Sequence, residues 1–156
     1  MALVNDVFFD TSILLLGLVE LGPPSRRPQE IFDAIVSGRL RRPMTAWHCC
    51  LEFYAVSTRL PEEYRLPPSD ALRLVEEEIS GRFRVLQLPE KDRKLFWRTS
   101  GHDRVIGGRI YDAHIAEIAR AAGARAVVTE NARHFTALGR HGIRVLGADD
   151  LLALLS

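Results

Sequence analysis

Three acidic residues stand far apart in the chain, each beside or inside an otherwise apolar stretch. Asp10 follows the apolar residues 7–9, Glu52 interrupts the apolar stretch 47–56, and Asp112 opens a helical pattern. Burial of a lone carboxylate is costly, so such a group is usually ionised only where a cation or hydrogen-bond donors compensate its charge. Three of them on core-forming segments predict a shared cation.

Hydrolysis of a phosphodiester is the chemistry that such a trio suits. The reaction needs a nucleophilic water and a stabilised leaving oxygen, and one or two Mg²⁺ or Mn²⁺ ions held by carboxylates provide both. Mg²⁺ favours a few carboxylates completed by waters and substrate oxygens, which fits three scattered acids better than a closed cage. Each residue also has a structural alternative: Asp10 as a helix N-cap, Glu52 as the partner of an arginine, and Asp112 as a favourable charge at a helix start.

The composition favours one globular domain spanning residues 1–156. Apolar residues make up 47% of the chain and the net charge is +1, so no global basic field indicates nucleic acid binding. All basic residues except Lys91 and Lys94 are arginines. Arginine makes planar contacts to phosphates, so local phosphate-binding patches stay open, although codon bias in a GC-rich genome explains the same excess.

The cysteines and the chain start indicate the compartment. Cys49 and Cys50 are adjacent inside an apolar stretch, which predicts core packing rather than a disulfide. No basic-then-apolar signal peptide opens the chain, and no apolar run reaches the ~20 residues of a membrane span. We therefore expect a cytoplasmic protein without a membrane partner.

Hydrophobic periodicity predicts strands that alternate with helical segments. We expect strands at 4–9, 39–44, 83–88, 126–129 and 143–146. We expect helices at 12–21, 29–36, 46–59, 71–80, 110–122 and 148–155, and a short one after Pro89, followed by a polar loop through Gly101, Gly107 and Gly108. Thr45, and Ser69 or Asp70, are the predicted N-caps. The alternation predicts an α/β fold, a three-layer α/β/α sandwich around a mostly parallel central sheet.

The predicted topology also places the acidic residues. In open parallel sheets, ligands bind beyond the carboxyl ends of the strands. Asp10 stands at the end of the first predicted strand, and residues 129–131 stand at the end of another. These two positions should therefore converge.

Four motifs, in this order, resemble those of PIN domains, and in particular of VapC-type toxins. They are DTSIL at 10–14, EF at 52–53, YDAHIA at 111–116 and TENARHF at 129–135. The resemblance extends over essentially the whole chain. It implies a PIN-like α/β/α fold and a ribonuclease site that depends on Mg²⁺ or Mn²⁺.

The resemblance also assigns roles to individual residues. It implies acidic metal ligands at Asp10, Glu52 and Asp112. Hydroxyl and amide side chains that would support the site by hydrogen bonding are Thr11, Ser12, Thr129 and Asn131.

His134 departs from the family pattern, since many relatives carry a fourth acidic residue at this place. The departure argues against a fully acidic second metal site. We count His134 among the candidate catalytic residues, and its role stays open between a metal ligand, a proton carrier, a phosphate contact and a structural hydrogen bond. His48 and His114 border apolar helix faces and are expected to be packed or solvent-facing.

The remaining expectations concern partners. Arg104, Arg109 and Arg133 flank the acidic motifs and are candidate contacts for RNA phosphates, with ordinary surface arginines as the alternative. The resemblance implies a homodimer and a protein antitoxin that inserts a segment near the site. Residues 14–18 and 29–36 are the candidate groove for that segment.

We therefore expect a metal-dependent endoribonuclease, the toxin half of a toxin–antitoxin pair. A phosphotransferase of the haloacid dehalogenase type also starts from a strand-end aspartate, but it needs a second acid where this chain has Ser12. A catalytically weak PIN-like module that binds RNA or acts as a scaffold is the other alternative. The presence of all three acidic residues argues against it.

Overall fold

A five-stranded parallel sheet forms the centre of the computed structural model, which describes residues 4–156. Its strand order is β5-β4-β2-β6-β7, and every neighbouring pair is parallel. The strands are β2 (Val7–Phe9), β4 (Met44–Ala46), β5 (Arg84–Leu86), β6 (Ala126–Val128) and β7 (Arg144–Leu146). All residues of β2, β4 and β6 are buried, as expected for strands covered on both faces.

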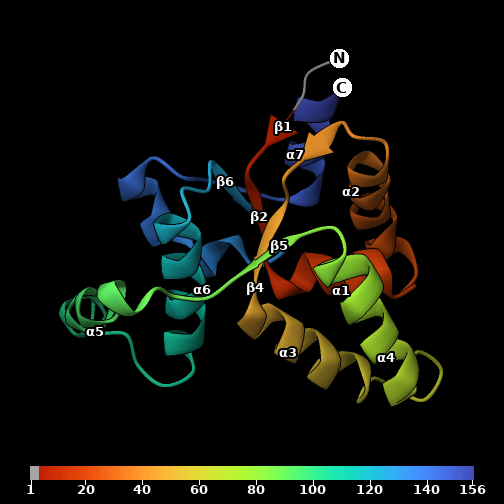
Figure 1. The fold of residues 1–156 in the computed structure, drawn as a ribbon, viewed down its shortest axis with the longest axis horizontal. Coiled ribbons are helices and arrows are strands. Elements are labelled where there is room, and N and C mark those ends of the chain that lie inside the picture. Colours follow the sequence, from red (N-terminus) through yellow and green to blue (C-terminus); the bar gives the residue numbers. More distant parts are fainter. Residues whose placement is uncertain (1–3) are drawn as a thin grey trace.

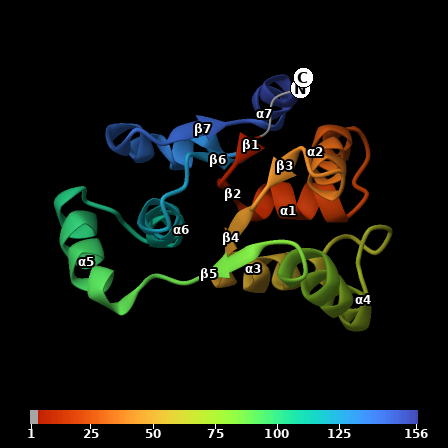
Figure 2. The ribbon, with the colours of Figure 1, turned by 45° about the horizontal axis from the view of Figure 1, so that its top comes forward.

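Helices cover both faces of the sheet (Figures 1 and 2). One layer contains α1 (Thr11–Leu18), α2 (Arg26–Val36) and α7 (Ala148–Leu155), and the opposite layer contains α5 (Arg93–His102) and α6 (Arg109–Ala121). Helices α3 (Trp47–Ser57) and α4 (Pro68–Leu74) lie beyond the carboxyl end of β4, beside α1 (Figure 1). The predicted three-layer α/β/α sandwich with a parallel sheet is therefore confirmed.

Short helical turns complete the chain. They are the 3-10 segments η1 (Pro23–Ser25), η3 (Glu90–Asp92), η4 (Ala132–His134) and η5 (Thr136–His141), and a π-helical segment η2 (Val75–Ser80) that prolongs α4.

The predicted helices at 110–122 and 148–155 agree with α6 and α7. The predicted polar loop was wrong at Gly101, because α5 continues to His102, and right at Gly107 and Gly108, which lie between α5 and α6. No helix in residues 4–156 combines the length and apolar character needed to cross a membrane.

Two predicted strands are broken, the first by Asp6 and the second by Arg42 and Pro43. Instead of continuous strands at 4–9 and 39–44, the chain forms a separate parallel pair of β1 (Val4–Asn5) and β3 (Leu40–Arg41). Asp6 and Arg42 follow these strands with φ angles of 58° and 54°, a region that residues other than glycine rarely adopt. The Nε atom of Arg42 lies 3.1 Å from Oδ1 of Asp6. Because both strands are interrupted here, β1 and β3 pair with each other in a separate two-stranded sheet.

The predicted helix caps were also wrong. Thr45 lies in β4, fully buried, and its hydroxyl donates to the carbonyl oxygen of Phe9 at 2.8 Å. A β-branched residue packs well in a strand, and this bond ties β4 to β2. Ser69 and Asp70 lie inside the first turn of α4, whose N-cap is Pro67. Pro68 occupies the first helical position, where the fixed φ of proline suits a helix and its missing N–H costs no hydrogen bond.

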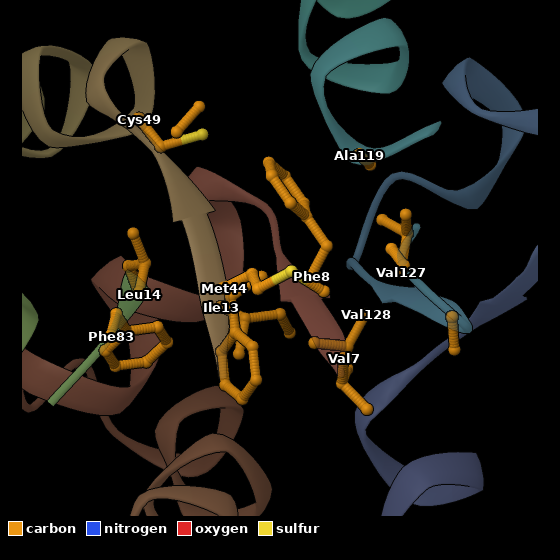
Figure 3. Packing of buried hydrophobic residues seen from close by; sticks show 14 of the residues in the cluster. Val7, Phe8, Ile13, Leu14, Met44, Cys49, Phe83, Ala119, Val127 and Val128 are labelled. Atoms are coloured by element: carbon orange, nitrogen blue, oxygen red, sulfur yellow. The ribbon is translucent and has the colours of Figure 1, made fainter. Parts of the chain in front are cut away.

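Aromatic and aliphatic side chains fill the space between the layers. Figure 3 shows Phe8 and Met44 on adjacent strands, with Val127 on the strand at the other side of Phe8. Cys49 and Cys50 are buried free thiols, so the predicted packing role is confirmed, and burial raises the pKa of Cys49 to about 12. A thiol with so high a pKa is not a nucleophile at neutral pH.

The two segments of the predicted antitoxin groove, residues 14–18 and 29–36, lie on α1 and α2. Leu14, the first residue of the first segment, is fully buried in the core, and α1 packs directly against α2. The close approach of these two helices depends on Gly17, because a Cβ atom there would overlap the ring of Phe32. That ring lies edge-on to Phe9, with the ring centroids 6.1 Å apart. The two predicted groove segments are therefore packed on each other.

We predict that Gly17→Ala destabilises the protein. Overpacking a core costs ~1–3 kcal/mol, whereas alanine in a helix gains at most ~1 kcal/mol over glycine. The net loss should be about 1 kcal/mol and should appear as a lower urea midpoint. Gly101→Ala is the matched control, since a Cβ there meets no atom within 4 Å. A Gly17 variant as stable as that control would show that the Phe32 ring moves freely.

Candidate active site

Asp10 is held where β2 and β6 end together. Its backbone amide donates to the carbonyl oxygen of Val128 at 3.1 Å, and its side chain is buried. The hydroxyls of Thr129 and Ser12 donate to the same carboxylate oxygen, Oδ2, at 2.7 and 3.0 Å. The expected convergence of the two strand ends is confirmed. Asp10 occupies the N-cap position of α1, but its carboxylate makes no capping hydrogen bond.

Backbone amides orient these two hydroxyls. The amide of Glu130 donates to Oγ of Ser12 at 3.1 Å, and the amide of Asn131 donates to Oγ1 of Thr129 at 2.9 Å. Asn131 thus supports Asp10 through its backbone. Within residues 4–156, the hydrogen bonds to the Asp10 side chain all reach Oδ2, which leaves Oδ1 available to a cation.

Glu52 reaches the site from the second turn of α3. The hydroxyl of Thr11 donates to its Oε1 at 3.1 Å, and Nε2 of His48 lies 3.3 Å from the same oxygen. Burial raises the pKa of Glu52. His48 and Thr11 lower this pKa, whereas the negative charges of Asp10 and Asp112 raise it. Glu52 is therefore within the electrostatic reach of both other acids, and its neighbour is a histidine rather than the arginine considered above.

Asp112 lies in the first turn of α6 and faces His134. Nδ1 of His134 is 3.2 Å from Oδ2 of Asp112. Burial raises the pKa of Asp112 and His134 lowers it, while the charge of Asp10 raises it again and Arg109 lowers it. The histidine that replaces the fourth acid thus contacts one of the three acids directly.

The arrangement fits an open cation site better than a closed one. Within residues 4–156, no three side chains of His, Cys, Asp or Glu are already placed to enclose a metal ion. The three carboxylates instead come from separate elements, and the charge of Asp10 raises the pKa of both Glu52 and Asp112. A hard divalent cation completed by water and substrate oxygens suits such a donor set.

His48 is the residue that the sequence analysis missed. Besides its contact with Glu52, its ring stacks on Tyr111, with centroids 5.6 Å apart and planes 16° from parallel. Tyr111 precedes Asp112 in the chain. The only signal in the sequence was the i, i+4 spacing of His48 and Glu52, which places them on one helix face.

A basic cavity of about 420 Å³ adjoins the site at His134. All three arginines predicted to contact RNA, Arg104, Arg109 and Arg133, line it. Among the described residues none of the three forms a salt bridge with an acid, in contrast to the neighbouring Arg140, whose Nη2 donates to Asp103 at 2.6 Å. Three arginine charges therefore remain available around one cavity.

The family follows from comparison with known proteins. A model of the PIN domain matches residues 6–133, a segment that contains Asp10, Glu52 and Asp112. The chain belongs to the PIN domain family. Its relative Ribonuclease VapC27 from Mycobacterium tuberculosis is 33% identical over 101 residues, which cover 65% of this chain and 71% of the relative.

Solved structures of this PIN protein's relatives have the same fold. VapBC-1 from nontypeable Haemophilus influenzae matches 92% of this chain and 98% of its own, with a TM-score of 0.62 and 18% identity. FitAcB from Neisseria gonorrhoeae matches 91% of this chain and 97% of its own, with a TM-score of 0.62 and 16% identity. At these identities the likeness establishes the fold.

We predict that Asp112→Asn leaves the metal-free protein folded at neutral pH, with an equal or higher melting temperature. The pKa of Asp112 is raised in the folded state, so its ionised form destabilises that state relative to the unfolded chain. As the pH falls through this raised pKa, Asp112 is protonated in the folded parent protein before it is protonated in the unfolded chain. The parent therefore regains the stability that the ionised Asp112 had cost. The advantage of the variant should therefore shrink in acid, as thermal unfolding with chelator at several pH values would show. Unfolding of the variant at neutral pH would make Asp112 a structural residue.

Proposed function

We propose that this PIN protein is a metal-dependent endoribonuclease that acts in the cytoplasm as the toxin of a toxin–antitoxin pair. The observation that carries the proposal is the convergence of Asp10, Glu52 and Asp112 from three elements, with the pKa values of Glu52 and Asp112 raised. The similarity to Ribonuclease VapC27 supports ribonuclease activity.

The proposed metal is Mg²⁺ or Mn²⁺, held by the three carboxylates. When bound, such an ion makes a water nucleophilic and stabilises the leaving oxygen of the phosphodiester. Oδ1 of Asp10 is the atom available to it, because Ser12 and Thr129 both donate to Oδ2. These two hydroxyls fix the carboxylate in one orientation, which is the role of residues behind the metal ligands.

The basic cavity is the proposed path of the RNA backbone. Arg104, Arg109 and Arg133 surround it, and its His134 contacts Asp112. Guanidinium groups bind phosphates through paired hydrogen bonds, which position a nucleic acid without reading its sequence. An RNA strand in this cavity therefore leads to the carboxylates.

The proposed partners are a protein antitoxin and a second copy of the chain. The similarity to structures named VapBC-1 and FitAcB supports assembly in a system of that type. A scaffold that has lost activity is the alternative function. The hydrogen bonds that orient Asp10 argue against it, because a site without catalytic activity does not require a buried carboxylate held in one orientation.

We predict that the purified protein, free of antitoxin, cleaves single-stranded RNA with Mg²⁺ or Mn²⁺ and that excess chelator stops cleavage. Asp112→Asn should lower the rate by more than roughly 100-fold, because loss of a partner behind the ligands already costs about 10–100-fold. Gel analysis of end-labelled RNA measures both effects. Asp33→Asn, an exposed change on α2, should keep the parent rate. Cleavage that persists in excess chelator would contradict the metal-dependent mechanism.

We predict that His134→Ala lowers the cleavage rate by at least about tenfold and changes its pH profile, since acid–base groups contribute about 10²–10⁴-fold. His102→Ala is the matched control, because His102 is exposed and does not line the basic cavity. Melting temperatures of both variants separate a loss of chemistry from a loss of stability. A parent-like rate and pH profile in His134→Ala would return this residue to a structural role.

A further inference from the structure

Five arginines stand at the amino edge of the parallel sheet, away from the candidate active site. They are Arg41, Arg42, Arg84, Arg125 and Arg144, and every one of them is exposed. We call them the amino-edge arginines. The carboxyl ends of the strands, where the acids lie, form the opposite edge: in Figure 1, β2 and β4 run from the side of β1 toward α1 and α3.

Backbone hydrogen bonds place these arginines in one row. The amide of Arg144 donates to the carbonyl oxygen of Arg125 at 3.3 Å, and the amide of Arg125 donates to that of Asp6 at 3.0 Å. The amide of Asp6 donates in turn to the carbonyl oxygen of Arg41 at 3.3 Å. These contacts join the starts of neighbouring strands, so the row crosses the sheet.

Arg84 extends the row to the edge strand β5. Its amide donates at 2.9 Å to the carbonyl oxygen of Pro43, the residue after Arg42. Neighbouring strands lie about 4.8 Å apart, so the four steps from β7 to β5 span roughly 19 Å. A row of that length suits an extended polyanion rather than a single phosphate.

Most of the positive charge in this row is uncompensated. Asp6 is the one acid at these strand starts, and its Oδ1 lies 3.1 Å from Nε of Arg42. Within residues 4–156, the other four amino-edge arginines form no salt bridge with an acid. The whole chain has 21 basic and 20 acidic residues, so this excess is local. Codon bias explains arginine in place of lysine, but it does not gather arginines at one edge.

His141 connects the row to the basic cavity. It lines that cavity, and Arg144 follows three positions later in the chain. Both side chains are exposed. At its other end the cavity reaches the carboxylates through the contact of His134 with Asp112. Basic groups therefore lead from the candidate active site, past the amino end of β7, to the opposite edge of the sheet.

We propose that the amino-edge arginines bind the backbone of the RNA substrate at a distance from the phosphate that is cut. Arginine contacts to phosphates hold a nucleic acid without reading its sequence, and their contribution to affinity falls as the salt concentration rises. The row continues the proposed path of the RNA, which favours a nucleic acid over an acidic protein segment. The substrate is then a long RNA that reaches both edges of the sheet. The inference rests on the proposed function for the identity of the polyanion as RNA.

Binding in excess chelator tests the row without cleavage. A labelled, long single-stranded RNA is titrated with the whole protein, and anisotropy gives its affinity at several salt concentrations. Arg125→Gln combined with Arg144→Gln should weaken binding roughly tenfold or more, because two charge-assisted contacts are lost. The slope of log affinity against log salt should become shallower by about 1.4, since each phosphate contact of a single strand contributes about 0.7.

Two further pairs of changes assign the effect to the row. Arg41→Gln with Arg84→Gln, from the other half of the row, should weaken binding in the same way. Arg59→Gln with Arg73→Gln is the matched control and should bind like the parent, because it removes the same charge from exposed positions beyond the carboxyl end of β4. Melting temperatures show that all three variants are folded.

RNA length separates the row from the active site. With Mg²⁺ or Mn²⁺, the Arg125 and Arg144 double variant should have a raised KM for the long RNA and an unchanged kcat. A tetranucleotide that carries the cut site mapped in the long RNA is too short to reach the amino edge, so its kcat/KM should match that of the parent. Arg133→Gln, in the basic cavity, should weaken cleavage of both RNAs.

Several outcomes would overturn the inference. They are affinity and salt dependence of the row variants equal to those of the control, an equal loss of tetranucleotide cleavage, and a parent protein that binds no RNA. Polyglutamate that binds the parent as tightly as RNA, and depends on the row as strongly, would assign the row to an acidic protein segment and overturn it too. Binding of the long RNA that depends on the row, with no cleavage after Mg²⁺ or Mn²⁺ is added, supports the row and contradicts the nuclease.

Discussion

The parallel pairing of β2 with β6 is the constraint on which the site depends. It brings Asp10 and Thr129 to the same edge of the sheet, where the threonine hydroxyl donates to the carboxylate at 2.7 Å. Because β2 is the middle strand and fully buried, Asp10 cannot turn into solvent. Its burial is tolerated because Ser12 and Thr129 supply donors. The other acids are arranged around this fixed carboxylate.

Mutual repulsion is the second physical feature of the site. Glu52 and Asp112 are held near Asp10 by helices that begin at the carboxyl edge of the sheet, and the pKa values of both are raised by burial and by the charge of Asp10. A histidine beside each of them, His48 and His134, opposes that rise. The field is therefore strongly negative at the centre and bordered by groups able to carry positive charge. Such a field attracts a cation while leaving room for a substrate.

Helix α6 organises the surroundings of the acids. Its first turn carries Asp112, one side lines the cavity with three arginines, and another side lines a second cavity beside α3 and α5. Arginine side chains dominate the charge of the first cavity, whereas apolar and aromatic side chains form most of the second. Helix α6 thus places Asp112 between two cavities of different chemistry.

The sequence by itself determined the alternation of strands and helices, the meeting of Asp10 with Thr129, and the family motifs, since periodicity and strand ends are local properties. Only the tertiary structure decided which face of each element met which partner. Positive φ angles at Asp6 and Arg42 split two strands, Thr45 became a strand residue that holds Phe9, and Leu14 entered the core. His48 joined the site only because α3 lies beside α1 and α6. A periodic pattern reports that a side chain will be buried or exposed, but its neighbours across the fold are set by packing between segments far apart in the chain.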